Sequence, residues 1–265
     1  MLATLDNSPQ KIIVYTATNE PLMPVRLYYK IHNEYLLIKA LKKLKCVSFE
    51  WDNKEFVISY YKEAKRLGLD VHYQDVPQEL YPVALAYGHI RNYVLHMDLR
   101  SLKRAVYIID FVAKYIPPTI MEITHFANSN KLTVTNDRNN SPKILDMDYD
   151  KFFDDNKIYH VDLQLELDKI KEIYKQEKSD DPEEKWERFE SYIRTKESDD
   201  YHEVEKIAIS YDKRSHNRLT SWLAMRSIIK STIAMEHYSG NTSYSSIDAI
   251  KKLLSRINDD LEEDD

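Results

Sequence analysis

Three polar side chains near the start of the chain have the residue types and spacing of a metal-dependent nuclease site. Glu50, Asp52 and Lys54 alternate at the end of a largely apolar stretch, residues 46–51, that predicts a buried strand. Such enzymes hold Mg²⁺ with carboxylates at strand ends and stabilise the charge on the reacting phosphate with a lysine. Glu34 is the nearest earlier carboxylate that could join them. The pattern is short and common, so we prefer the other interpretation: Asp52 caps a helix and Lys54 lies in solvent.

Two His-x-Asp pairs, His96 with Asp98 and His160 with Asp162, come closest to the spacing of metal ligands. On a strand, both side chains of a pair would lie on the same face and could chelate an ion. On a helix, they would diverge by about 200°. The apolar spacing over residues 83–97 favours a helix. We therefore interpret these histidines as making ordinary polar contacts, and no metal site is predicted.

The acidic run that contains Asp146, Asp148 and Asp150 resembles the first half of a calcium-binding loop. Such a loop also needs glycine at its sixth position and glutamate at its twelfth. The chain has Lys151 and Lys157 at these positions. The run is therefore interpreted as a surface loop.

The densest basic segment is a candidate nucleic-acid contact. Lys213, Arg214 and Arg218 could meet phosphates, while Tyr211 and Trp222 could stack on bases. A solvated connection between two helices explains the same residues equally well, and both interpretations stay open.

Residue counts exclude several common chemistries. The chain of 265 residues has only three glycines, Gly68, Gly88 and Gly240. Their spacing can form neither a P-loop nor the glycine-rich turn of a dinucleotide-binding fold, and no nucleophile elbow is present. Cys46 is the single cysteine, which excludes disulfides within the chain, cysteine-based zinc sites and iron–sulfur clusters. The net charge of −6 disfavours general binding of polyanions.

The elements that would position these residues differ between the two parts of the chain. The β-type stretches are 11–16, 25–31, 46–51, 69–73, 130–134 and 142–146. The helical stretches of the first part are 34–44, 52–67, 83–97 and 102–116, although residues 93–99 also alternate as a strand would. The order strand, helix, strand over 46–73 predicts a βαβ unit.

From residue 163 onward the pattern predicts helices only. We therefore expect a mixed α/β domain with a partly parallel sheet over residues 1–160. An all-helical domain with an acidic tail would follow over 161–265, and the whole chain would be rich in helix.

The leading functional prediction is a non-catalytic, cytoplasmic binding or adaptor protein. Its 20 tyrosines and its helical part would contact a protein partner or a second copy of the chain. No cofactor is predicted. The N-terminus has no leader pattern, and the most apolar stretch, residues 105–113, is too short to span a membrane. One alternative is a nucleic-acid-associated protein, including a nuclease that uses Mg²⁺. Another is an enzyme or a nucleotide-sensing α/β domain.

Overall fold

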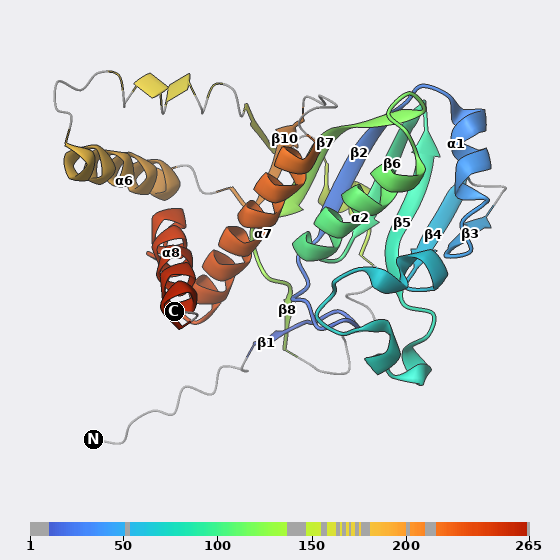
Figure 1. The fold of residues 1–265 in the computed structure, drawn as a ribbon, viewed down its shortest axis with the longest axis horizontal. Coiled ribbons are helices and arrows are strands. Elements are labelled where there is room, and N and C mark those ends of the chain that lie inside the picture. The colour runs from blue at the N-terminus through green and yellow to red at the C-terminus, as the bar shows by residue number, and fades with distance from the viewer. Residues whose placement is uncertain are drawn as a thin grey trace.

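The computed structural model describes residues 11–50, 54–136, 147–154, 158–162, 165, 168–169, 171–172, 175, 181–199, 202–209 and 216–263. Within these residues the chain forms one large sheet, a small two-stranded sheet and several helices (Figure 1).

The large sheet has eight strands in the order β3-β4-β5-β6-β2-β7-β10-β9. Neighbouring strands pair antiparallel, except that β9 runs parallel to β10. The strands are β2 (Val25–Ile31), β3 (Val47–Glu50), β4 (Glu55–Ser59), β5 (Ala84–Arg91), β6 (Val94–Leu99), β7 (Met121–Ser129), β9 (Tyr159–Val161) and β10 (Val204–Ala208). The small sheet pairs β1 (Ile12–Ile13) with β8 (Val134–Thr135).

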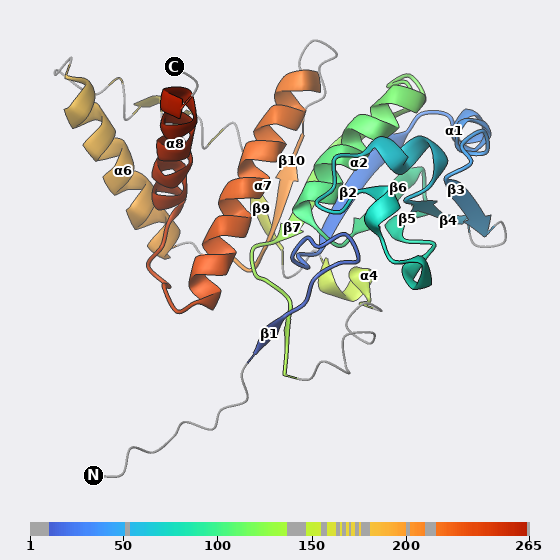
Figure 2. The same ribbon diagram turned by 60° about the horizontal axis from the view of Figure 1, so that its bottom comes forward.

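Two long helices, α2 and α7, lie side by side on one face of the large sheet (Figure 1). At the end of the molecule away from β3, α6 lies beside α8 (Figure 2). There Arg194 Nη2 donates to Asp248 Oδ1 over 2.7 Å. The helices are α1 (Glu34–Leu41), α2 (Leu102–Tyr115), α4 (Tyr149–Phe152), α6 (Pro182–Asp199), α7 (His216–Tyr238) and α8 (Ser246–Glu263). The 3₁₀ turns are η2 (Lys62–Arg66), η3 (Tyr73–Asp75) and η4 (Gln78–Leu80).

Alternation along the central strands separates an apolar face of the sheet from a polar one. On β2, Leu27 and Tyr29 point into the main hydrophobic core, which also contains the buried side chains of α2. Arg26, which comes directly before Leu27 on the strand, points to the opposite face, where α4 packs. The apolar face therefore supplies the stability of the fold, and the polar face is left for chemistry.

The sequence correctly predicts the elements whose patterns are unambiguous. Strand 25–31 is confirmed as β2, and helix 102–116 is confirmed as α2, which ends one residue earlier. Ser101 caps this helix by accepting a hydrogen bond from Arg104 N at 3.1 Å. The cap and the apolar stripe mark the same residues as a helix. Local sequence preference and packing against the core therefore favour the same structure here.

Two predicted helices are wrong because hairpins form in their place. Residues 83–97 form the antiparallel hairpin β5–β6, whose turn is made by Asn92 and Tyr93, both with positive φ. Residues 52–67 contribute β4 and η2 instead of one helix. In each case the apolar residues fit a helical spacing, but pairing with neighbouring strands decides the structure.

The predicted fold class is contradicted in two respects. The βαβ unit over 46–73 is absent, because β3 and β4 form an antiparallel hairpin and the sheet is mostly antiparallel. The C-terminal part is not all-helical either, because β10 joins the large sheet between β7 and β9. The division into domains at residue 160 stays a prediction.

A buried ion pair ties the N-terminal segment to α2. The Arg104 side chain is only 2% exposed, and its Nε donates to Glu20 Oε2 over 3.1 Å. The same guanidinium donates to Thr18 Oγ1 at 2.6 Å and to the Ala84 carbonyl at 3.1 Å. One side chain thus joins the N-terminal segment, α2 and β5, and its removal would leave the Glu20 carboxylate buried without its counter-charge.

We expect Arg104→Met to lower the free energy of unfolding by about 3–5 kcal/mol, because it leaves a buried charge unpaired. Urea unfolding followed by circular dichroism measures this loss. Lys103→Ala is the matched control, since Lys103 forms an exposed pair with Asp70 and should cost less than about 1 kcal/mol. Equal losses in the two variants would contradict this role for Arg104.

Candidate functional site

An open cavity of about 290 Å³ lies on the polar face, where β5, β6 and β2 meet α4. Three arginines, two acidic residues from α4 or its cap, and alternating residues of the strands surround it. The lining residues are Arg26, Tyr87, His89, Arg91, Asp98, Arg100, Met147, Asp148, Tyr149 and Asp150.

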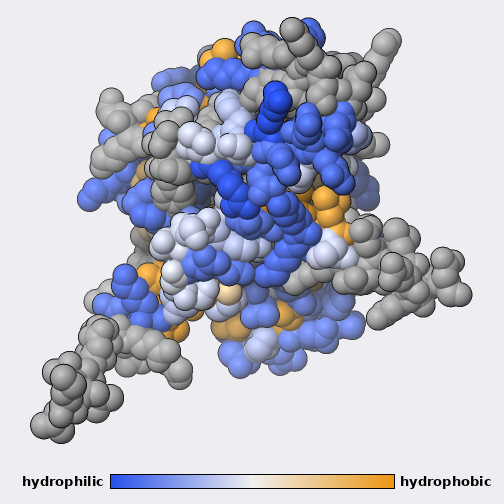
Figure 3. Space-filling model, turned by 90° about the vertical axis from the view of Figure 1, so that its left-hand side faces the viewer, coloured by the Kyte–Doolittle hydropathy of each residue, from blue (hydrophilic) through white to orange (hydrophobic). Residues whose placement is uncertain are grey.

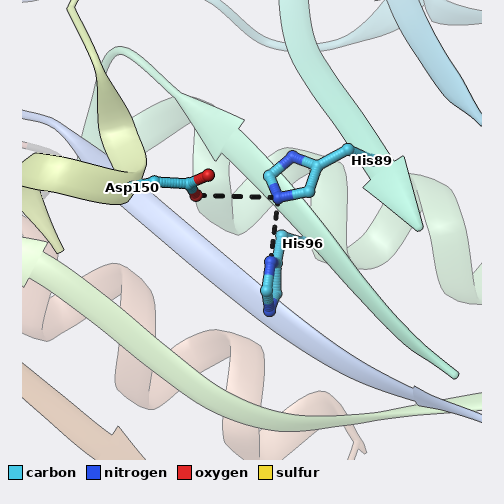
Figure 4. A group of neighbouring side chains, drawn as sticks. All are labelled: His89, His96 and Asp150. Carbon is cyan, nitrogen blue, oxygen red and sulfur yellow. Dashed lines mark hydrogen bonds and ion pairs between the residues drawn. The ribbon is translucent and has the colours of Figure 1, made fainter. Parts of the chain in front are cut away.

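Two histidines from adjacent strands face each other on this side of the sheet (Figure 4), and one of them, His89, lines the cavity. His89 on β5 and His96 on β6 are cross-strand partners, and His89 Nε2 lies 2.9 Å from His96 Nδ1. The carboxylate of Asp150, on α4, approaches to 3.9 Å from His89 Nε2. One ligand atom from each of the three residues lies within 4.8 Å of the others.

A buried arginine holds the acidic residues in place beside the histidines. Arg26 is paired with Asp98 through Nε–Oδ1 and Nη2–Oδ2 contacts of 2.6 and 2.8 Å. Its third nitrogen, Nη1, donates to Asp150 Oδ1 at 2.7 Å. Arg91 Nη1 donates to the other oxygen of Asp150, also at 2.7 Å. Arg26 therefore joins β2, β6 and α4 through charged hydrogen bonds, which are the stronger kind.

The short helix α4 carries Asp150 to the site. Asp148 caps this helix by accepting from Lys151 N at 3.1 Å. Tyr149 donates its hydroxyl to the Leu99 carbonyl of β6 at 2.8 Å. Phe153, just after the helix, is buried in a small cluster with Tyr28, Ala127 and Ile158 on this face of the sheet. These contacts anchor both ends of α4, so the position of Asp150 is set by packing.

The environment keeps both histidines neutral. Burial and the neighbouring Arg26 charge lower the pKa of His89 from 6.5 to about 4. Burial, His89 and Arg26 lower the pKa of His96 to the same value. Burial disfavours the charged form of Asp150, but hydrogen bonds from Arg26 and Arg91 outweigh it and lower its pKa to about 2. At neutral pH the site therefore offers two neutral imidazoles and one carboxylate.

This set of groups has the chemistry of a transition-metal site. Neutral imidazole and carboxylate are ligands of Zn²⁺ and related ions. Two nitrogens bound at about 2.1 Å to a tetrahedral ion would lie about 3.4 Å apart, so the two histidines, whose nitrogens are 2.9 Å apart, would have to separate by about 0.5 Å to hold one. An ion could then replace the hydrogen bond that the two histidines share. The three arginines at the cavity suit an anionic ligand beside the ion.

The structure does not show whether Glu50, Asp52 and Lys54 form the nuclease site that the sequence suggested. Glu50 ends β3 and is exposed, and Lys54 is exposed and donates to Glu34 at 2.5 Å. Asp52 lies outside the described residues. Of the proposed nucleic-acid contacts, Lys213 and Arg214 also lie outside them. Arg218 belongs to α7.

The sequence analysis noted the spacing of His96 and Asp98 but predicted no metal site, and it did not connect His96 with His89. His96 and Asp98 do share a face of β6, but Asp98 pairs with Arg26 and the partner of His96 is His89. A hairpin with a two-residue turn at positions 92 and 93 places His89 opposite His96, so recognising that turn would have predicted the pair. In the other pair, Asp162 accepts a hydrogen bond from Leu165 N at 3.0 Å.

No protein family, curated protein or solved structure matches this chain. Among the described residues, none of the helices has the length and apolar character needed to cross a bilayer. The functional conclusion therefore depends on the geometry of the site.

We expect the free energy of unfolding to fall by about 2 kcal/mol for each histidine, or roughly 4 kcal/mol for the pair, between pH 7 and pH 5. In this range the unfolded chain takes up protons at His89 and His96, whereas the folded protein takes them up only near pH 4. The stabilising contribution of the neutral pair is complete above about pH 6.5 and is lost as the pH falls. Urea unfolding at the two pH values measures the change.

The matched variant carries His89→Gln and His96→Gln, which remove both titrating groups. Its free energy of unfolding should change less between pH 7 and pH 5 than that of the original protein. An unchanged pH dependence in the double variant would show that other groups cause it.

Proposed function

We propose that the protein is a metal-dependent phosphoesterase whose ion is held by His89, His96 and Asp150. The observation that carries the proposal is the pair of neutral imidazoles, 2.9 Å apart and beside a carboxylate, of which His89 and Asp150 line a cavity that also contains three arginines. Imidazoles that stay unprotonated at neutral pH are ready to bind an ion without first losing a proton.

Three arginines and three aspartates line the cavity, so their formal charges balance, and a bound divalent ion would make the site positive and favour a phosphoester over a neutral substrate. Arg91 is exposed, with 59% of its side chain accessible, and Arg100 is half-buried at the same cavity. Guanidinium groups bind phosphate oxygens with matching geometry. Arg26 pairs with Asp98 and with Asp150, so its role is to hold the carboxylates. Arg91 also donates to Asp150 through Nη1, and it lines the cavity together with Arg100, so both guanidinium groups would lie beside a bound phosphate.

The reaction supported by these groups is hydrolysis. His89, His96 and Asp150 would hold the ion, which would supply a water molecule of lowered pKa as the nucleophile. Attack of that water on phosphorus would break the bond to the leaving oxygen, with the proton lost by the water passing to solvent and the leaving oxygen taking one from it. Arg91 and Arg100 would stabilise the charge that develops on the phosphate oxygens.

The predicted adaptor role stays a prediction. Three apolar side chains of α7, Met225, Ile228 and Met235, are exposed at spacings that place them toward one side of the helix. Seen from the end that carries α6 and α8, however, the surface is mostly hydrophilic, and hydrophobic residues form small separate patches (Figure 3). The polar cavity is the more specific feature.

We expect His89→Ala and His96→Ala each to weaken Zn²⁺ or Mn²⁺ binding by about 100-fold or more, because each removes a ligand. Asp150→Asn should weaken it by about 10- to 100-fold. Isothermal titration calorimetry measures the affinities, and a chromogenic phosphodiester reports turnover with and without the ion. Turnover should be lost in the same variants.

Two controls sharpen the test. His32→Ala removes a histidine that lies beside Glu122 on the same sheet, outside the cavity, and should leave metal binding unchanged. Glu50→Gln tests the alternative nuclease site. Metal affinity that is insensitive to His89→Ala, or turnover that depends on Glu50 and not on His89, would contradict the proposal.

A further inference from the structure

We infer that Tyr87 and Arg100 form a base-binding subsite next to the metal site, so that the substrate is a nucleotide unit. This inference rests on the proposed phosphoesterase function and specifies its substrate class. It is carried by the partly exposed aromatic ring of Tyr87, which lines the same cavity as His89.

Tyr87 is placed by the same strand that carries His89. The two residues are two positions apart on β5, so their side chains stand on the same face about 7 Å apart. That spacing is comparable to the distance between the phosphate and the base of a nucleotide. A phosphate at the ion near His89 would therefore put its base over Tyr87.

The ring of Tyr87 is available for stacking. The residue is 40% exposed, although its neighbours Ala86 and Gly88 on the strand are buried. The Arg100 guanidinium lies 5.6 Å from the ring centroid. An aromatic ring and a guanidinium together form a surface on which a nucleobase stacks, and Arg100 can also meet the phosphate.

The strand beneath this ring is held rigidly. Gly88 faces the other side of the sheet, where the Phe56 ring of β4 packs so closely that a Cβ atom at position 88 would collide with it. Tyr87 itself lies between its cross-strand partners Val57 and Asp98. Because Tyr87 is held on a rigid strand, binding of a base to its ring would cost the protein little conformational entropy.

Either a free nucleotide or a nucleotide within a single strand would supply this chemistry. A base in a duplex is stacked and paired, so it would first have to leave the helix. Single-stranded nucleic acid and mononucleotides are therefore the two sources that the experiment has to distinguish.

The test compares two esters with the same leaving group, thymidine 5′-p-nitrophenyl phosphate and methyl p-nitrophenyl phosphate, in the presence of the ion. We expect the original protein to prefer the thymidine ester by about tenfold or more in kcat/KM, as stacking of one base provides. Tyr87→Ala should reduce this preference by about tenfold, and Tyr87→Phe, which keeps the ring, should retain it. Tyr93→Ala is the control, since Tyr93 is 67% exposed in the hairpin turn and does not line the cavity.

A second measurement identifies the source. Fluorescence anisotropy with a labelled single strand, competed by the same strand without label, thymidine monophosphate, inorganic phosphate or duplex, ranks the ligands. Competition by the single strand or the mononucleotide at lower concentration than inorganic phosphate supports the subsite and shows which source binds better.

The outcomes separate the two proposals. If both esters are hydrolysed equally, with dependence on the ion and on His89, the subsite is wrong and the phosphoesterase function stands. A preference that is unchanged in Tyr87→Ala would also overturn the subsite. If neither ester is hydrolysed, the phosphoesterase function fails, and the inference fails with it. Metal titration of Tyr87→Ala shows whether the neighbouring site has kept its shape.

Discussion

The charge of Arg26, buried in the middle of the sheet, is the constraint on which the polar face depends. A guanidinium that is 4% exposed must be neutralised within the protein, because an unpaired buried charge is strongly destabilising. Asp98 on β6 provides one carboxylate and Asp150 on α4 the other. The pairing therefore fixes the register of β2 with β6 and draws α4 onto the sheet. It also places a positive charge beside His89 and His96, which helps to keep both imidazoles neutral.

The architecture explains why these groups can be held so precisely in place. The side chains of α2 cover the apolar face, and every second residue of β2, β5 and β6 is thereby turned to the other side. Cross-strand pairing then sets the distance between His89 and His96, with no loop involved. Only Asp150 comes from outside the sheet, and the packing of Phe153 fixes its helix. Sites that are built on strands in this way need little reorganisation when a ligand binds.

The sequence predicted an element correctly where its local signals, such as a helix cap and the spacing of apolar residues, indicated the same structure. For α2, the Ser101 cap and the apolar stripe indicate the same helix, and the structure confirms it. For β5 and β6, the apolar spacing fits a helix, and the Asn92–Tyr93 turn that decides for a hairpin uses positive φ values, which asparagine tolerates but tyrosine seldom adopts. This error concealed the pairing of His89 with His96. The role of Asp150 was beyond prediction, because its contact with the histidines is long-range and depends on how α4 packs.

The most direct test of the metal site is anomalous diffraction from crystals grown with Zn²⁺, with data collected at the zinc absorption edge. We predict one strong anomalous peak between the two strands, about 2.0–2.2 Å from a ring nitrogen of His89 and of His96 and from a carboxylate oxygen of Asp150. Absence of a peak at this position, with the hydrogen bond between His89 and His96 intact, would contradict the account. The structure would then describe a neutral histidine pair that is held by Arg26 and its carboxylates for stability alone.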